Sequence, residues 1–229
     1  MRLVAGAFLL IFGLTLAAYV LASKLSALHW TWALDLAIPA LIVGFVVNTN
    51  YLGLHRVYRD RLMETFLPNL RNVRSNRWGL ATQSDDALIE NMCQSPNRRP
   101  YHLINTNVVL VDSPEAKYRG RGGDSFVLSP LYCGSDATGW RKSADYMKST
   151  GRGITLPTAM AISAAAANPN SGAAGKGPTV NRLVSILMSL LSIRLGYWAP
   201  HPDPKKSWPF APNFIYPGLT GGILPGGLS

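Results

Sequence analysis

The chain has 229 residues, of which 48% are hydrophobic and only 15% charged, and its 22 Lys and Arg residues against 12 Asp and Glu give a formal net charge of +10. This length is sufficient for one domain with a sizeable core plus an additional segment. The charge favours anionic partners, such as phospholipid head groups or nucleic acid, without choosing between them. The two cysteines, Cys93 and Cys133, exclude a disulfide scaffold, and we expect both to be reduced thiols.

The first apolar segment, residues 3–22, contains no charge and reaches the length of about 20 residues that crosses a bilayer. A signal peptide is the competing interpretation, although its apolar region is usually only about 7–15 residues long. A second apolar run, residues 33–47, follows three aromatic or histidine side chains typical of an interfacial belt. Its Asp35 lies near the aromatic end, where the carboxylate can reach the interface. The pattern predicts a transmembrane helical hairpin over residues 1–49.

The basic residues predict how this hairpin is oriented. Only Lys24 lies between the two predicted spans, whereas Arg56, Arg59 and Arg61 follow the second one. Because basic residues favour the cytoplasmic side, both ends of the chain are expected in the cytoplasm.

The segment 50–100 is expected to hold an amphipathic basic helix and a polar linker. In residues 51–66, Leu54, Tyr58, Leu62 and Phe66 recur every four residues and the charged residues take the other faces. Arginines 56, 59 and 61 are candidate contacts for acidic lipid head groups. A simple solvated helix face is an equal alternative, and nucleic acid is disfavoured because a membrane surface would be nearer.

The segment 101–229 has the pattern of an α/β domain. Residues 101–111 and 124–134 are rich in β-branched and apolar residues and predict two strands. Residues 139–153 show no periodicity and predict a loop. Two helices are expected, over 156–168, with Pro157 in the first turn, and over 180–198, with a broad leucine face.

No motif in the chain supplies a complete catalytic or metal site. Ser163 is not in the G-x-S-x-G turn that exposes a nucleophile, and within a helix its hydroxyl is expected to bond a backbone carbonyl. Catalysis by Ser163 with some other base remains a minor alternative. The segment 172–179 lacks the spacing of a phosphate-binding loop. The four histidines are scattered, so neither a metal nor a cofactor is expected.

Five blocks in order carry a family resemblance: "YRDRLMETFLPN", "PYHLINTNVVLV", "SFVLSPLYCGS", "TAMAISAAAANPNSG" and "IRLGYWAPHP". Together they cover about residues 50–202, and this order resembles the middle of large bacterial patatin-like phospholipase-related membrane proteins. The resemblance implies a partial patatin-like α/β domain in the bacterial inner membrane. It also implies hydrolysis of phospholipid acyl esters by a serine–aspartate dyad.

This chain departs from that family at both catalytic motifs, since it contains no G-x-S-x-G and no Asp-Gly-Gly. The resemblance therefore implies a fragment that is inactive alone, with the nucleophile and aspartate on missing flanking segments. It further implies that polar side chains organise backbone near the completed site, namely those of Asn105, Asn107, Ser163, Asn168 and Asn170. The alternative hypothesis is a non-enzymatic, membrane-anchored module that binds acidic lipids through its basic helix.

Overall fold

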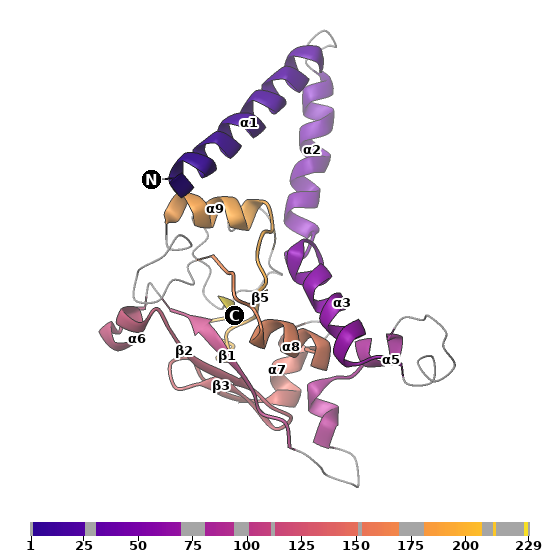
Figure 1. Cartoon of the computed structure of the whole chain (residues 1–229), viewed down its shortest axis with the longest axis vertical. Helices are drawn as coiled ribbons and strands as arrows, with labels where there is room; N and C mark the ends of the chain where they lie inside the picture. The colour runs from indigo at the N-terminus through magenta and orange to yellow at the C-terminus, as the bar shows by residue number, and fades with distance from the viewer. Residues whose placement is uncertain are drawn as a thin grey trace.

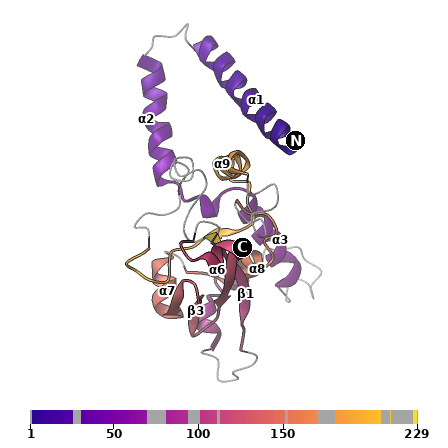
Figure 2. The same ribbon diagram turned by 90° about the vertical axis from the view of Figure 1, so that its left-hand side faces the viewer.

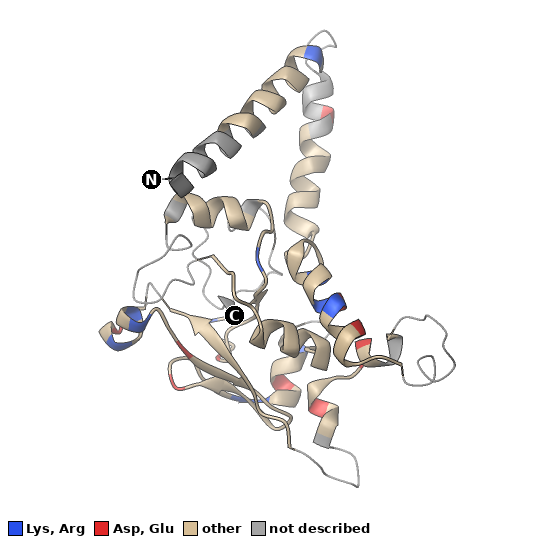
Figure 3. Cartoon of the chain, viewed as in Figure 1, with Lys and Arg blue, Asp and Glu red and all other residues tan. Residues whose placement is uncertain are grey.

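The computed structural model describes residues 2–25, 31–69, 81–93, 101–110, 113–150, 153–169, 181–207, 213 and 227–228. Two long helices project from one end of the molecule, and a mixed sheet-and-helix body lies at the other end (Figure 1). Figure 2 shows that these two helices, the two arms of the molecule, stand apart at the body and come closer together at their far ends. Charged side chains are sparse on these arms and gather on the body (Figure 3).

The two arms are α1, Arg2–Leu25, and α2, Thr31–Val46. Helix α2 contains Pro39 and rises only about 24 Å over its 16 residues, less than the bilayer core of about 30 Å. Within the described residues, no helix combines the length and the apolar character that crossing a membrane requires. The predicted transmembrane hairpin is therefore wrong, and so is the inner-membrane localisation that depended on it.

Helix α3, Leu54–Phe66, confirms the predicted amphipathic helix, but a different face is buried. The enclosed side chains are His55, Arg59 and Met63, whereas Leu54 and Phe66 are exposed. The four-residue period was correct, and the choice of face was wrong. Polar residues occupy the inner face because the neighbouring segments supply hydrogen-bond partners for them.

A six-stranded sheet with the order β4-β3-β2-β1-β6-β5 forms the centre of the body. Every pairing between the described strands is antiparallel, so the described architecture is a small antiparallel sheet with helices, not the α/β fold that was predicted. The strands are β1 Ile104–Val109, β2 Gly123–Leu128, β3 Tyr132–Ser135, β4 Gly139–Lys142, β5 Tyr197–Trp198 and β6 Gly227–Leu228.

Two predicted segments differ from the structure. The strand expected over 124–134 is a hairpin, because the chain turns at Ser129, whose hydroxyl accepts from Tyr132 N at 3.2 Å and donates to Tyr132 O at 2.6 Å. The loop expected over 139–153 contains β4 and helix α7, Ser143–Ser149. Periodicity could not find a four-residue edge strand, because so short a run contains too few positions to repeat.

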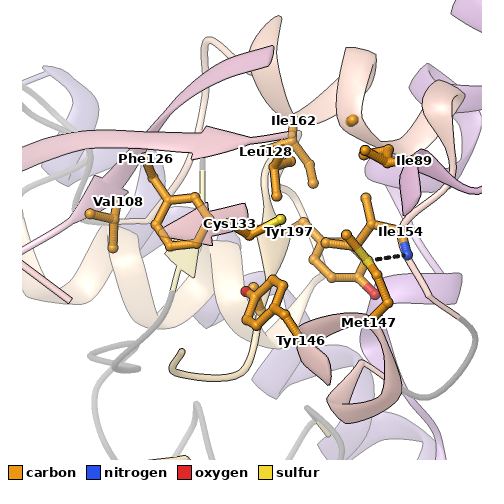
Figure 4. Packing of buried hydrophobic residues seen from close by; sticks show 12 residues of the cluster. Ile89, Val108, Phe126, Leu128, Cys133, Tyr146, Met147, Ile154, Ile162 and Tyr197 are labelled. Carbon is orange, nitrogen blue, oxygen red and sulfur yellow. Dashed lines mark hydrogen bonds between the residues drawn. The ribbon is translucent and has the colours of Figure 1, made fainter. Parts of the chain in front are cut away.

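The apolar core lies between the sheet and the helices α7 and α8, Leu156–Ser163 (Figure 4). Phe126 from β2 faces Tyr146 from α7, with ring centroids 6.2 Å apart. Alanines Ala159 and Ala161 are fully buried on α8, where their small size lets the helix approach the strands. Helix α8 ends five residues before the predicted end, since Ala164 leaves the helical ladder.

The remaining described helices are short. Helix α9, Arg182–Leu190, is capped by Asn181, whose side-chain oxygen accepts from Leu183 N at 3.0 Å. It lies beneath one end of α1 (Figures 1 and 2). The others are η1 Thr49–Tyr51, α5 Thr82–Asp85, η2 Ile89–Cys93 and α6 Ala116–Arg121.

Candidate functional site

A cavity of about 490 Å³ opens beside α3. Five chain segments meet around it: the turn before α3, α3 itself, the region of α5, the start of α8, and β5. Its lining residues are Asn50, Tyr51, His55, Arg56, Arg59, Asp85, Asp86, Leu88, Gly153, Thr155, Thr158 and Tyr197.

Backbone contacts hold these segments in place. Leu156 N donates to Ala87 O at 2.7 Å and Ile89 N donates to Ile154 O at 3.2 Å, which fixes the α5 region against the start of α8. On the other side, Gly53 has φ +82°, and a Cβ there would lie 2.6 Å from Ser192 O. Only glycine allows this close crossing, so it determines where α3 begins.

Arg59 forms the centre of the cavity wall, with only 4% of its side chain exposed. Its Nε donates to Thr158 Oγ1 at 3.0 Å, and its Nη2 donates to Thr155 Oγ1 at 3.1 Å and to Asp85. Its Nη1 donates to Asp60 Oδ1 at 2.8 Å. The guanidinium is therefore buried with two carboxylates and two hydroxyls, which is the condition for keeping such a charge inside a protein.

His55 lines the same cavity and is held by one backbone bond. Its Nδ1 lies 2.6 Å from Leu195 O, and because a carbonyl cannot donate, Nδ1 carries the proton. Burial, against the opposing Leu195 bond and with a smaller contribution from the charges of Arg194, Arg59 and Arg56, lowers the pKa of His55 to about 4. At neutral pH the ring is uncharged, and Nε2 is an acceptor.

Two further groups have shifted acidity because they are buried. Burial raises the pKa of Tyr197, whose ring lies 5.5 Å from that of His55. Burial also raises the pKa of the Cys133 thiol, which is free and hydrogen-bonded near Ser143 and Ser129 in the apolar core. The side chain of Cys93 lies outside the described residues. Cys133 is therefore a packed core residue, remote from the cavity lining.

The structure brings two of the predicted scaffold residues together. Ser163 Oγ donates to the backbone oxygen of Asn105 at 2.7 Å, so it bonds a carbonyl as expected, although on β1 instead of on its own helix. The side-chain oxygen of Asn105 accepts from Ser125 Oγ at 2.5 Å. Asn107 follows on the same exposed strand face, and Asn168 is buried elsewhere, while Asn170 lies outside the described residues.

The three arginines predicted to contact lipid have different surroundings. Arg59 is enclosed as described above, and Arg56 pairs with Asp60 at 3.0 Å. Arg61 is exposed on α3. Head-group binding by this set stays a prediction.

Sequence reasoning missed His55, Arg194, Thr155 and Thr158 as site residues. The series His55, Arg59, Met63 has the same four-residue spacing as the leucine and aromatic series beside it, so a signal was present. The sequence analysis did not assign this series to the buried face, because histidine and arginine side chains are usually exposed on a helix.

The described residues contain no group of three or more His, Cys, Asp or Glu side chains suited to a metal ion. Among the same residues, no hydrogen bond joins Ser163 to a histidine or carboxylate side chain. No protein-family model, curated protein or solved structure matches the chain. The resemblance to patatin-like proteins therefore stays a prediction from the five sequence blocks.

Proposed function

We propose that this chain is a non-catalytic, central portion of a patatin-like lipid acyl hydrolase. In this proposal the nucleophilic serine and the aspartate belong to flanking segments, and the chain supplies scaffold for the site. The substrate class is a phospholipid acyl ester, as in the family that the five blocks resemble. The observation that carries the proposal is the Ser163 hydroxyl, which is engaged with the Asn105 backbone and not with a base.

The edge of β1 also supports this proposal. Leu110 N donates to Gly122 O, so Leu110 turns its backbone groups toward β2. Successive residues of a strand point these groups to alternate sides, so those of Asn105 and Asn107 point away from β2, to the other edge of β1. Among the described strands, β6 pairs with this edge at Val108 only, and Ser163 bonds it at Asn105. Because β6 lies beside β1 in the sheet, only the Asn105 end of this edge is left for a strand from a flanking segment.

The alternative, a non-enzymatic module that binds acidic lipids through Arg56, Arg59 and Arg61, has less support. The guanidinium of Arg59 already has four protein partners, and Arg56 has a carboxylate partner. Of the three, only Arg61 is classed as exposed, and the Arg56 side chain, 38% exposed, is engaged by Asp60. A lipid-binding surface needs several available charges, since each contributes about 1 kcal/mol.

An esterase assay tests the proposal directly. The purified chain and its Ser163→Ala variant are each given a short-chain acyl ester, and we expect no hydrolysis by either. Activity in the parent chain that disappears in the variant would make Ser163 a nucleophile and overturn the proposal.

The flanking DNA supplies the second test. We expect the reading frame to encode G-x-S-x-G upstream and Asp-Gly-Gly downstream, and the extended protein to hydrolyse the ester. That activity should be lost when the upstream serine is replaced by alanine and kept in Ser163→Ala. Stop codons on both sides would contradict the proposal.

A further inference from the structure

The interior beneath α9 is partly polar, since the helix buries Val184 and Leu187 but also two serines. Ser185 and Ser189 are 0% and 1% exposed, whereas Leu183 on the same helix is 50% exposed. Thr49 and Asn50, from the turn before α3, are buried against the segment that follows α9. Hydroxyl and amide groups thus line a region where an ordinary helix would place its apolar side chains.

Arg194 lies at the centre of this polar interior and is the largest fully buried side chain in the described residues. Its Nη2 donates to Thr49 Oγ1 at 3.2 Å and to Asn50 Oδ1 at 3.0 Å, and its Nη1 donates to Ser192 Oγ at 3.2 Å. The guanidinium carbon lies 5.3 Å from the ring centre of Trp198. All of these partners are neutral.

No described carboxylate neutralises this charge. The chain has twelve Asp and Glu residues, and all except Asp112 lie in the described ranges. The ion pairs formed there by Asp60, Asp85 and Asp145 involve other basic residues. Burial lowers the pKa of Arg194 to about 9, so the side chain remains charged at neutral pH. A buried cation without a counter-ion is strongly unfavourable.

Unpaired donors accompany the uncompensated charge. Arg194 Nε and Trp198 Nε1 are both buried without a hydrogen-bond partner, and so is the hydroxyl of Ser189. Buried N–H groups are nearly always paired in folded proteins. These two N–H groups belong to side chains in a cation–π contact with each other. Both groups are donors, so the partner that they lack is an acceptor, and a negative charge on that acceptor would also offset the charge of Arg194.

We propose that a small oxyanion, carried as a carboxylate or a phosphate group, binds the guanidinium of Arg194 and accepts from Arg194 Nε and Trp198 Nε1. Guanidinium groups bind such planar or tetrahedral oxyanions through paired N–H donors. Asn50, which bonds Arg194, also lines the cavity beside α3, whereas Arg194 and Trp198 themselves lie behind that lining. The proposal is independent of the proposed hydrolase function.

Thermal unfolding of the purified chain tests this site, with inorganic phosphate replacing chloride at constant ionic strength and pH 7. We expect a saturable rise in the midpoint, because a ligand that binds only the folded state stabilises it. The apparent affinity should fall at least tenfold in Arg194→Gln. The control Lys148→Gln, which removes one positive charge from a side chain 80% exposed, should keep the response. No rise in the parent chain, or an equal rise in Arg194→Gln, would overturn the proposal.

A second pair of variants tests the site if Arg194→Gln does not fold. Thr49→Asp places a carboxylate beside Arg194 Nη2, and we expect it to raise the midpoint without phosphate and to remove the phosphate response. Thr49→Val has nearly the same shape without the charge and should keep the response. A Thr49→Asp variant that responds to phosphate like the parent would contradict the proposal.

The source of the oxyanion is distinguished by Asp112→Asn. If the proposal is correct, the parent chain and this variant respond to phosphate alike. A response that appears only in Asp112→Asn would show that the chain's own carboxylate neutralises Arg194, and would overturn the proposal of an external ligand. Acetate titrated in the same way separates a carboxylate site from one that requires phosphate.

Discussion

The body of this protein contains two interiors that are stabilised differently. Between the sheet and helices α7 and α8, side chains such as Phe126, Leu128 and Tyr146 pack without charge (Figure 4). Between α3 and the segment after α9, the buried groups include Arg59, Arg194 and a neutral histidine. The apolar interior is stabilised by the area that it removes from water. The polar interior is stable only if each buried polar group has its partner. Its stability should therefore respond to pH and to solutes that leave the apolar interior unaffected.

The largest expected effect lies in the apolar interior. Phe126→Ala should lower the free energy of unfolding by about 3–5 kcal/mol, because it removes a buried ring and leaves a cavity against Tyr146. Urea denaturation measures this change, and the loss should be equal at pH 5 and pH 7.5. The exposed Phe66 is the matched control, since Phe66→Ala should change stability by no more than about 0.5 kcal/mol. If the loss of stability in Phe126→Ala depended strongly on pH, the claim that the apolar interior is insensitive to pH would be contradicted.

The next effect is a pH dependence in the polar interior, from His55. Its pKa is about 4 in the folded chain and about 6.5 when unfolded, so between these values only the unfolded chain is protonated there. Stability should therefore fall as pH is lowered from 6.5 to 4, by about 3 kcal/mol in total, and be unaffected by His55 above pH 6.5.

His55→Asn is the control for this pH dependence. Its amide can still donate to Leu195 O, but it does not titrate, so the difference from the parent between pH 4 and 6.5 isolates His55. Urea denaturation curves collected across this range provide the measurement. Parallel pH profiles for the two proteins would show that the histidine is not buried as described.

A smaller effect is expected for Arg59→Met. The change should cost about 2 kcal/mol, because Thr155 and Thr158 lose a donor, while Asp60 and Asp85, each 40% exposed, regain water. The exposed Arg61 provides the comparison on the same helix, and Arg61→Met should be within about 0.5 kcal/mol of the parent. If urea denaturation showed equal losses of unfolding free energy for the two variants, the assignment of Arg59 to the inner face and Arg61 to the outer face of α3 would be contradicted.

The smallest effect is expected for Ser163→Ala, at about 1 kcal/mol, since it removes one side-chain bond from α8 to the β1 edge. Hydrogen exchange of the β1 amides should also quicken, because α8 no longer holds that edge. A variant as stable as the parent with unchanged exchange would mean that the bond does not join the two elements.

How far the sequence predicted the fold depended on the length of each element. The helix over 51–66 was found because four turns repeat the pattern enough times to be recognised. The segments 124–134 and 139–153 were misassigned because three-residue turns and four-residue strands carry little periodic signal. The apolar segments at the front were correctly expected to be helical. Their membrane role was inferred from the length of the apolar runs, but no described helix is both long and apolar enough to cross a membrane.

By itself, the sequence determined the local features: the helical arms, the Asn181 cap, the proline at the start of α8 and the small residues that let α8 approach the sheet. These depend on neighbouring residues only, so composition and spacing contain them. Tertiary structure decided which face of α3 turned inward and which hydroxyls surrounded Arg194. Those outcomes depend on partners about 100 to 145 positions away in the chain, and a buried charge can be placed only where such partners meet.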